Sequence, residues 1–352
     1  MTSLFEAFPA LERKIPWVRL GEWPTPIEPL RVAGGEIWIK RDDLTGRVYG
    51  GNKVRTLEAM FGRAQAEGAT RIWATGAYGS NHALATVLHA PAAGLEPGVI
   101  LFPQPPSACA ADNLRAVLGA RPRFQRLLSW ATLPLAVVRR RREPSTLVML
   151  PGAAVPEGAL GYVSAGLELA GQIASGAAPL PSRIFLGVGS TCTSAGLLVG
   201  LWIAERKGLL ARRPIVCAVR VTPWPVTSAY RIVSLAMRTA RLLASLTASP
   251  EPTSRELKQG LRVIGGFIGR GYGHTTASGI AAQGAFAAAG GPPLDTVYAA
   301  KSAAGALAAA PDGAPALYWS TKSSRRLPPV DSAACMNSAP ALTEWLARSV
   351  SS

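Results

Sequence analysis

The stretch from Arg183 to Gly200 reads RIFLGVGSTCTSAGLLVG and shows a pattern that recurs along the chain. Arg183–Leu186 is a short apolar run typical of a buried strand, and Ala195–Ala204 is an apolar run of helical length. A turn of glycine, serine and threonine separates the two runs. Strand, small-residue turn and helix in this order predict one unit of a parallel sheet covered by helices.

Similar units lie on both sides of this stretch. Short strand-like runs alternate with helical stretches through most of the 352 residues. The expected strands are 36–40, 71–74, 98–102, 146–150 and 215–222, and the expected helices are 53–67, 81–93, 110–118 and 161–173. We therefore predict an α/β fold of three layers, with helices on both faces of mostly parallel sheets.

The turn at 187–193 is a candidate phosphate site. Backbone N–H groups at a helix start, together with the hydroxyls of Ser190, Thr191 and Thr193, would surround an anion. There is no GxGxxG motif here, and the next strand ends near Arg220 rather than in an acid that would bind a ribose. One phosphate is therefore favoured over a dinucleotide. A plain strand-to-helix turn with a hydroxyl cap is the alternative.

Lys53 is a candidate covalent cofactor site. It follows Gly50, Gly51 and Asn52 at the expected first turn of a helix, where glycine lets the backbone approach a ligand closely. The positive end of the helix dipole and desolvation both lower the pKa of an amine placed there. Such a lysine can form a Schiff base with an aldehyde cofactor. The alternative is an ordinary surface lysine.

The motif at 76–82, GAYGSNH, follows an expected strand and opens an expected helix. Ser80 and Asn81 would supply side-chain donors at an anion-binding helix N-terminus. The same residues would also serve as an ordinary helix cap, and the motif alone leaves both interpretations open.

Further motifs lie in order along the chain: PTPIE at 24–28, IKRDDL at 39–44, GGNKVR at 50–55, TGA at 75–77, SNH at 80–82, GALGY at 158–162, TSAGL at 193–197, GYG at 271–273, DTVY at 295–298, AKS at 300–302 and YWST at 318–321. Together they resemble the 1-aminocyclopropane-1-carboxylate deaminase and D-cysteine desulfhydrase family. These are pyridoxal-phosphate enzymes with the fold type II architecture of the tryptophan synthase β subunit. The resemblance covers nearly the whole chain, and its specificity lies in the colinear set rather than in any one motif.

The resemblance implies a role for each matching residue. Lys53, with Asn52 beside it, would bind pyridoxal 5'-phosphate and move the α-proton of the substrate. Asn81 would hydrogen-bond the 3′ oxygen of the cofactor, and Ser80 would contact the substrate. The remaining members are the phosphate-binding residues Gly189, Ser190, Thr191, Cys192 and Thr193, Thr321 facing the pyridine nitrogen, and the pocket tyrosines Tyr272 and Tyr298. For the two tyrosines, core packing is the alternative.

Several positions depart from the family pattern. Gly79 stands where a glutamine is common, and Thr56 replaces a frequent lysine. Ala299 replaces the acid that follows the second tyrosine in the deaminases, which argues against ring-opening deamination. Thr191 and Cys192 replace small residues, and 274–278 (HTTAS) replaces an acidic stretch.

Composition limits the remaining function classes. The formal charge is +16, from 37 Lys and Arg against 21 Asp and Glu, and 48% of residues are hydrophobic. No aromatic residues interleave with the scattered basic ones, so a solvated basic surface is favoured over nucleic-acid binding. Cys109, Cys192, Cys217 and Cys335 are too far apart to predict a zinc or disulfide framework. No stretch predicts a signal peptide or a membrane span, so a cytoplasmic protein is expected.

We predict two lobes, a small α/β lobe of residues 56–159 and a large pyridoxal-phosphate lobe of residues 1–55 and 160–352. The expected enzyme is a lyase or deaminase of the D-cysteine desulfhydrase kind, which converts a small amino acid into a keto acid and ammonia. The resemblance also suggests a homodimer. The alternatives are another fold type II enzyme, such as a racemase or synthase, or an inactive descendant that binds a partner through the basic segment 127–142.

Overall fold

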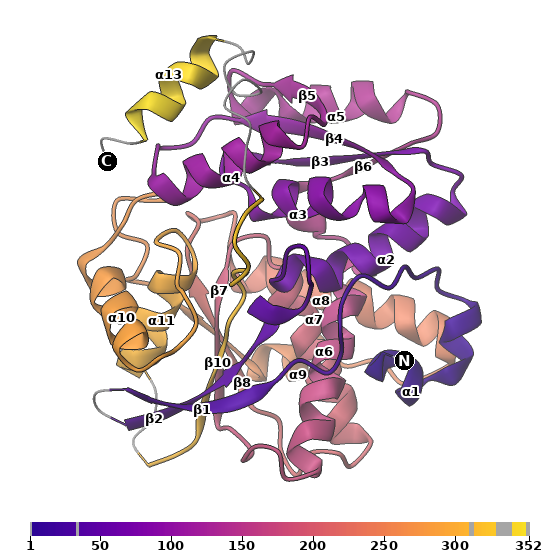
Figure 1. Cartoon of the computed structure of the whole chain (residues 1–352). Coiled ribbons are helices and arrows are strands. Elements are labelled where there is room, and N and C mark those ends of the chain that lie inside the picture. The colour runs from indigo at the N-terminus through magenta and orange to yellow at the C-terminus, as the bar shows by residue number, and fades with distance from the viewer. Residues whose placement is uncertain (1, 33–34, 310–312, 329–339, 350–352) are drawn as a thin grey trace.

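The computed structural model describes residues 2–32, 35–309, 313–328 and 340–349, so Cys335 lies outside the described part. Within it, the strands form two separate sheets, one above the other in Figure 1. Eight strand pairings hold the two sheets together, and all but one of these pairings are parallel. The predicted α/β fold with mostly parallel sheets is confirmed.

The larger sheet has six strands. In spatial order they are β1 (Ile27–Val32), β2 (Gly35–Lys40), β10 (Ala316–Trp319), β7 (Arg183–Val188), β8 (Ile215–Arg220) and β9 (Leu261–Ile264). Only the β1–β2 hairpin is antiparallel. Strand β10 comes from late in the chain and inserts between β2 and β7, which joins the two ends of the sequence in one sheet.

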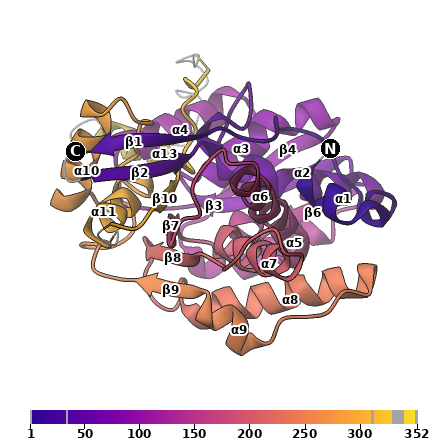
Figure 2. The ribbon, with the colours of Figure 1, turned by 90° about the horizontal axis from the view of Figure 1, so that it is seen from below.

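Helices cover both faces of the larger sheet (Figure 2). One face packs against a hydrophobic cluster formed largely by α1 (Ser3–Ala7), α6 (Pro156–Ala174), α7 (Cys192–Arg206), α8 (Ala229–Thr247) and α9 (Ser254–Gln259). The other packs against α10 (Ala277–Ala288) and α11 (Ala299–Ala309). Helix α7 is buried along nearly its whole length, which explains its apolar sequence on every side.

The smaller sheet has four parallel strands in the order β5 (Arg123–Arg126), β4 (Glu96–Phe102), β3 (Arg71–Ala77) and β6 (Thr146–Met149). One face packs against α2 (Asn52–Ala66), α3 (Asn81–His89), α4 (Ala108–Gly119) and the C-terminal helix α13 (Pro340–Arg348). Helix α5 (Leu133–Arg141) covers the other. Short 3₁₀ turns complete the connections: η1 (Pro9–Arg13), η2 (Asp42–Leu44), η3 (Pro91–Ala93), η4 (Trp130–Thr132) and η5 (Pro151–Ala153).

The proposed small lobe, residues 56–159, contains all four strands of the smaller sheet. Helix α13 lies beside the same sheet, although its sequence position is far outside that range (Figure 1). Trp345 of α13 packs edge-on against Tyr78 and donates a hydrogen bond to the carbonyl of Gln104 at 2.7 Å. We keep the boundaries at 56 and 159 as a proposal, with α13 as a second contributor to the small lobe.

The segment 121–142 contains a strand that its sequence did not predict. Arg123–Arg126 forms β5 at the edge of the smaller sheet, and only then do η4 and α5 follow. An edge strand has one unpaired side and partly exposed side chains, so it needs no apolar pattern. Ala136 and Val137 of α5 are buried against the sheet, while several apolar side chains, among them Leu135, stay exposed.

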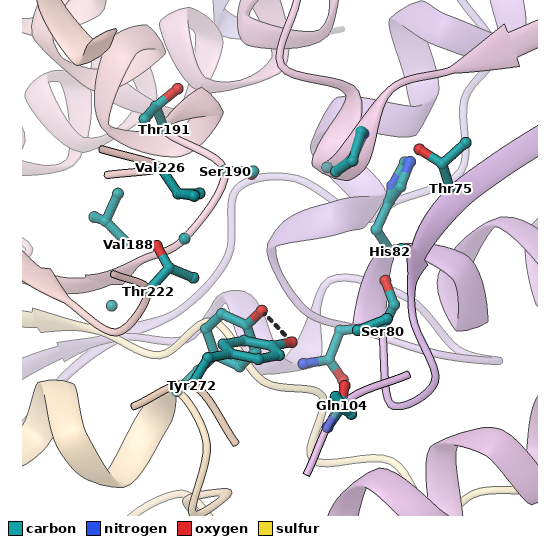
Figure 3. Close-up of a pocket in the computed structure, with 18 of the residues that line it drawn as sticks. Thr75, Ser80, His82, Gln104, Val188, Ser190, Thr191, Thr222, Val226 and Tyr272 are labelled. Carbon is teal, nitrogen blue, oxygen red and sulfur yellow. Dashed lines mark hydrogen bonds between the residues drawn. The ribbon is translucent and has the colours of Figure 1, made fainter. Parts of the chain in front are cut away.

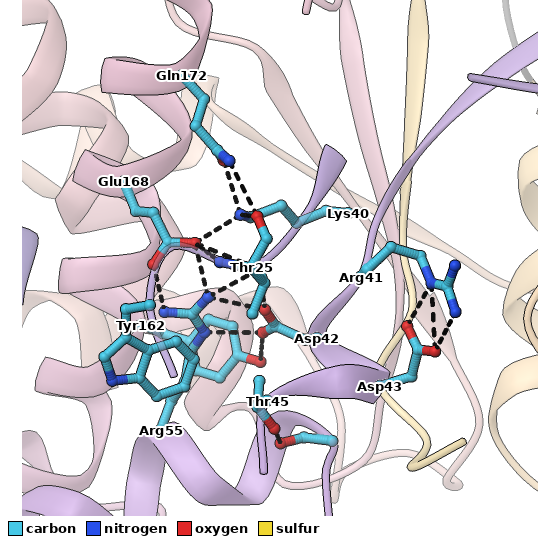
Figure 4. Close-up of polar contacts among 12 residues, drawn as sticks. Thr25, Lys40, Arg41, Asp42, Asp43, Thr45, Arg55, Tyr162, Glu168 and Gln172 are labelled. Atoms are coloured by element: carbon cyan, nitrogen blue, oxygen red, sulfur yellow. Dashed lines mark hydrogen bonds and ion pairs between the residues drawn. The ribbon is translucent and has the colours of Figure 1, made fainter. Parts of the chain in front are cut away.

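Buried charges fix α2 to the larger sheet (Figure 4). The Arg55 guanidinium donates to both carboxylate oxygens of Asp42 at 2.8 and 2.9 Å, and to both of Glu168 at 2.9 and 3.0 Å. Lys40 donates to Glu168 from the opposite side at 2.5 Å. All four side chains are at most 3% exposed. Because Arg55 is two residues after Lys53, this cluster holds the first turn of the helix that carries Lys53.

Candidate active site

A cavity of about 620 Å³ lies where the two sheets face each other. It is lined by residues at or just after the carboxyl ends of β3, β4 and β6 in the smaller sheet and of β7, β8 and β10 in the larger one. Parallel strands gather their loops at this edge, which is the usual place for ligands in α/β folds. Eleven of the twelve site residues that the sequence suggested line this cavity: Asn52, Lys53, Ser80, Asn81, Gly189, Ser190, Thr191, Thr193, Tyr272, Tyr298 and Thr321.

Lys53 lies in the first turn of α2 and faces the cavity rather than the outer surface. Gly51 precedes it with φ 95°, and a side chain there would come within 2.7 Å of the Thr321 carbonyl. This close approach pairs Gly51 with Lys322 and brings Lys53 beside the Thr321 segment. Burial lowers the pKa of the Lys53 amine. A larger share of the amine is therefore unprotonated and nucleophilic at neutral pH.

The loop after β7 is the candidate anion site. Thr191 adopts a left-handed conformation, φ 64°, just before α7 begins. Such a backbone is strained for threonine and natural for glycine, which explains why small residues stand here in the family pattern. Gly152 lies close to this loop, since a side chain placed on Gly152 would come within 2.2 Å of Ser190 Oγ. The Asn52 side chain donates to Thr193 Oγ1 at 3.0 Å, which ties this loop to α2.

The structure does not bring the Cys192 side chain to the cavity. It is fully buried, and its Sγ lies 3.5 Å from the Ala153 carbonyl and 4.0 Å from Thr56 Oγ1. Burial raises the pKa of this thiol to about 11. The side chain of Cys192 therefore packs in the core, and the assignment of Cys192 to the phosphate-binding turn stays a prediction.

Asn81 presents an N–H donor to the cavity, because its carbonyl oxygen is already occupied. Asn81 Oδ1 accepts from Asn113 at 2.8 Å, Tyr49 at 3.0 Å and Lys322 at 3.0 Å. An ammonium can only donate, so the atom facing Lys322 must be the oxygen. The Asn81 amide nitrogen is thereby oriented as a donor, and it can donate a hydrogen bond to an acceptor oxygen of a ligand.

The structure confirms the helix-cap interpretation of Ser80, and the anion-binding interpretation stays a prediction. Ser80 Oγ accepts the backbone N–H of Ala83 at 3.2 Å and so caps α3. It also lines the cavity, on the side opposite Ser190 and Thr191 (Figure 3).

Tyr272 and Tyr298 meet at the cavity wall, where their hydroxyls are 2.8 Å apart (Figure 3). Burial raises the pKa of Tyr272 to about 12 and that of Tyr298 well above its ordinary value. Both hydroxyls are therefore neutral at physiological pH, and one of them can donate to a ligand. The rings line the cavity as well as packing edge-on against each other.

His82, Gln104 and Lys322 are among the polar lining residues that carried no site assignment from the sequence. His82 is 2% exposed, and both of its ring nitrogens are without a hydrogen-bond partner among the described residues. Burial, with a contribution from Lys53, lowers its pKa to about 3. Lys322 follows Thr321, and Gln104 comes from the loop after β4. His82 and Lys322 each adjoin a residue that the motifs had identified, which was the available signal.

Gln104 explains the departure at Gly79. The Gly79 N–H donates to Gln104 Oε1 at 3.1 Å, and a side chain on Gly79 would come within 2.4 Å of Ala110. Glycine is thus required by the close approach of α4, and a glutamine from the loop after β4 lies beside the position. Two other departures, Thr56 and Ala299, are buried away from solvent and do not line the cavity.

The residues around the cavity fit pyridoxal phosphate. The cofactor needs an amine for its aldehyde, an anion site for one phosphate and a donor for its phenolic oxygen. Lys53, the strained loop at Ser190 and Thr191, and the oriented Asn81 amide supply these three features. The orphaned nitrogens of His82 also indicate that the cavity is built to hold a polar ligand.

In the described residues, no helix has the length and apolar character that crossing a membrane requires. Nor does any group of three or more histidine, cysteine or acidic side chains come together there in an arrangement suited to a metal ion.

Comparisons with known proteins agree with the geometry of the cavity. The sequence profile of the family described as "Pyridoxal-phosphate dependent enzyme" matches residues 18–316. D-cysteine desulfhydrase of Salmonella paratyphi C is 31% identical over 83% of this chain and 88% of its own length. A solved structure described as an ACC deaminase homologue superposes with a TM-score of 0.74 and 26% identity, over 91% of this chain and 94% of that one.

Nocardicin C-9' epimerase of Nocardia uniformis subsp. tsuyamanensis is 36% identical over 53% of this chain. The match spans 59% of the epimerase, and a match to a putative 1-aminocyclopropane-1-carboxylate deaminase of Pyrococcus horikoshii likewise spans 61% of that relative. The similarity to the epimerase is therefore partial in length. Taken with the match over residues 18–316, these likenesses show that the chain belongs to the family of pyridoxal-phosphate dependent enzymes.

Proposed function

We propose that this enzyme is a lyase that removes the α-proton and a β-substituent from an α-amino acid, giving a keto acid and ammonia, as in the reaction of a D-cysteine desulfhydrase. The observation that carries the proposal is the amine of Lys53, whose pKa is lowered, in a cavity that also holds a single anion-binding loop. Ala299, where the deaminases have an acid, favours elimination over opening of a cyclopropane ring.

Bound pyridoxal phosphate supplies an electron sink for the bond that breaks at the α-carbon. Lys53 would hold the cofactor and then act as the base that takes up the α-proton. Asn81 donates to an acceptor oxygen, and its orientation is fixed by Lys322. Thr321 offers a neutral hydroxyl rather than a carboxylate to the ring nitrogen, which restrains the electron sink and suits elimination better than transamination.

Ser80 and the tyrosine pair would act on the substrate side of the cavity. Their hydroxyls are neutral and can donate to a substrate carboxylate or a leaving group. Tyr272 and Tyr298 share one hydrogen bond, so only one of the two hydroxyl protons is engaged between them.

Epimerisation at the α-carbon is a second candidate. It is supported by the 36% identity to nocardicin C-9' epimerase over half of this chain. It shares the first proton removal with elimination and differs in returning a proton instead of expelling a group. Incorporation of solvent deuterium at the α-carbon without release of keto acid would favour it.

The purified protein with added pyridoxal phosphate should show a visible absorption band that borohydride reduces. Lys53→Ala should abolish the reducible band, whereas Lys258→Ala, on the exposed side of α9, should leave it unchanged. Keto acid release from a panel of D- and L-amino acids then tests the reaction. A wild-type protein without the band would refute the assignment of Lys53, and a band without any turnover would favour an inactive descendant.

We also propose a homodimer in the cytoplasm, as the resemblance suggests. Light scattering after size-exclusion chromatography tests the dimer, and cell fractionation tests the location.

A further inference from the structure

We infer that the substrate carries a large, uncharged, apolar or aromatic side chain, which two tryptophans at the opening of the cavity would contact. This inference rests on the proposed function, because it takes the ligand of the cavity to be an amino acid. It replaces the three-carbon substrate of the desulfhydrases with a bulkier class.

The first wall of the opening comes from the small lobe. Trp130 of η4 and Leu133 at the start of α5 both line the cavity. Trp130 is 72% exposed, so it lies at the mouth and not in the interior. Helix α5, which follows η4 directly, is packed on the smaller sheet, because its Ala136 and Val137 are buried against β4 and β6. An indole held in solvent in this way lacks the core contacts that usually explain a large aromatic residue.

The second wall comes from the loop after β8 in the large lobe. Trp224 and Val226 line the cavity there and are 72% and 47% exposed. This loop is anchored at its base, since Thr227 Oγ1 bonds Thr222 Oγ1 at 2.5 Å and the carbonyl of Gly189 at 2.8 Å. The loop that presents Trp224 is therefore tied directly to the proposed phosphate-binding turn.

The opening carries no free charge among the described residues that line it. The charged members of the lining are Lys53, Lys322 and Asp295. Both carboxylate oxygens of Asp295 accept backbone N–H groups at the start of α11, and Lys322 donates to three neutral oxygens. The lining also includes apolar residues that are at least partly exposed, among them Phe102, Pro103, Pro105, Trp130, Leu133 and Trp224.

The separation of the polar lining residues from the apolar ones indicates the class of substrate. The polar groups that would bind an amino acid head lie inside, and an apolar rim from two lobes lies outside. Pockets of roughly 300–1,000 Å³ hold drug-sized ligands, and the cavity of about 620 Å³ falls within that range. A side chain of one or two heavy atoms would leave the rim without a ligand, whereas an aromatic side chain would reach it.

The test is a binding titration of the holoenzyme with phenylalanine and alanine, each as D- and L-isomer. Neither has a β-leaving group, so the change in the visible band of the bound cofactor reports binding alone. The better phenylalanine isomer should bind at least about tenfold more tightly than the alanine of the same configuration, since burial of a phenyl group contributes roughly 1.5–3 kcal/mol.

Trp130→Ala and Trp224→Ala should each lower this ratio at least about threefold and leave the affinity for alanine within about twofold. Tyr230→Ala is the matched control, because Tyr230 is an exposed aromatic residue outside the cavity lining, and it should change neither value.

Equal binding of alanine and phenylalanine by a holoenzyme that responds to both would overturn the inference and leave the proposed function in place. A visible band that no amino acid perturbs would overturn both. Loss of dimer mass in the tryptophan variants, with an unchanged ratio, would assign Trp130 and Trp224 to contact between copies and overturn the inference.

Discussion

Replacement of Arg55 by methionine should destabilise the protein by about 3–5 kcal/mol, the range for breaking a buried ion pair by removing one partner. Arg55 donates to Asp42 and Glu168 through all of its N–H-bearing nitrogens and also reaches Thr25 Oγ1 at 3.2 Å. Methionine fills similar space but leaves two carboxylates in the interior, with only Lys40 beside Glu168 as a cation.

The pKa of Glu168 gives an independent magnitude. Burial raises this pKa, but Arg55 and Lys40 overcome that effect and lower it from 4.5 to about 2. A difference of this size corresponds to roughly 3 kcal/mol of stability. Because the unfolded state binds the proton more tightly, the contribution is present above about pH 4.5 and is lost as the pH falls toward 2. The free energy of unfolding of Arg55→Met should therefore fall by less between pH 7 and pH 3 than that of the wild-type protein.

Urea unfolding of the cofactor-free protein, followed by circular dichroism, measures both effects. Arg63→Met is the matched control on the same helix, because Arg63 is 38% exposed and pairs with Glu67 and Glu157 at the surface. It should cost less than about 1 kcal/mol. A loss below about 1 kcal/mol for Arg55→Met, at an unchanged denaturant slope, would refute the reasoning.

Two further predictions concern residues that the motifs did not assign. Because burial lowers the pKa of His82 to about 3, the unfolded state binds the proton more tightly between pH 6.5 and 3, and stability should fall as the pH decreases through that window. His82→Phe should therefore lose less stability than wild type between pH 7 and 5 in urea unfolding; an identical pH dependence would contradict this. Lys322→Met removes the cation that orients Asn81, so the dissociation constant of pyridoxal phosphate should rise about tenfold and the visible band should shift. Unchanged values, matching those of Lys258→Met, would rule out this positioning role.

The sequence was sufficient to predict the fold class because the patterns that indicate this class are local. Apolar runs followed by small-residue turns predict strands and helix starts, and β7, its loop and α7 lie where RIFLGVGSTCTSAG indicates them. The strands that the sequence did not predict are β1, β5, β9 and β10, and of these β5 has residues RFQR without an apolar pattern. An edge strand is stabilised by pairing with its neighbour, and pairing is not visible in a single segment.

Most of the candidate site also followed from motifs, since its residues lie at consecutive strand ends. What the motifs missed came from contacts between distant segments. Gln104 lies beside Gly79, and Trp130 lines the same cavity as Trp224 although the two residues follow strands of different sheets. Cys192 lies in the predicted turn, but the burial of its side chain in the core could not be inferred from the motif.

The sequence by itself determined the family and the cofactor and predicted the residue that would hold it, because the order of motifs along the chain can be read without coordinates. Only the tertiary structure decided the chemistry around that residue. Lys53 becomes a candidate nucleophile through burial, Asn81 becomes a donor through Lys322, and the opening becomes apolar through two tryptophans. Each of these depends on desolvation or on a contact between segments far apart in the chain, and neither quantity is encoded in local sequence.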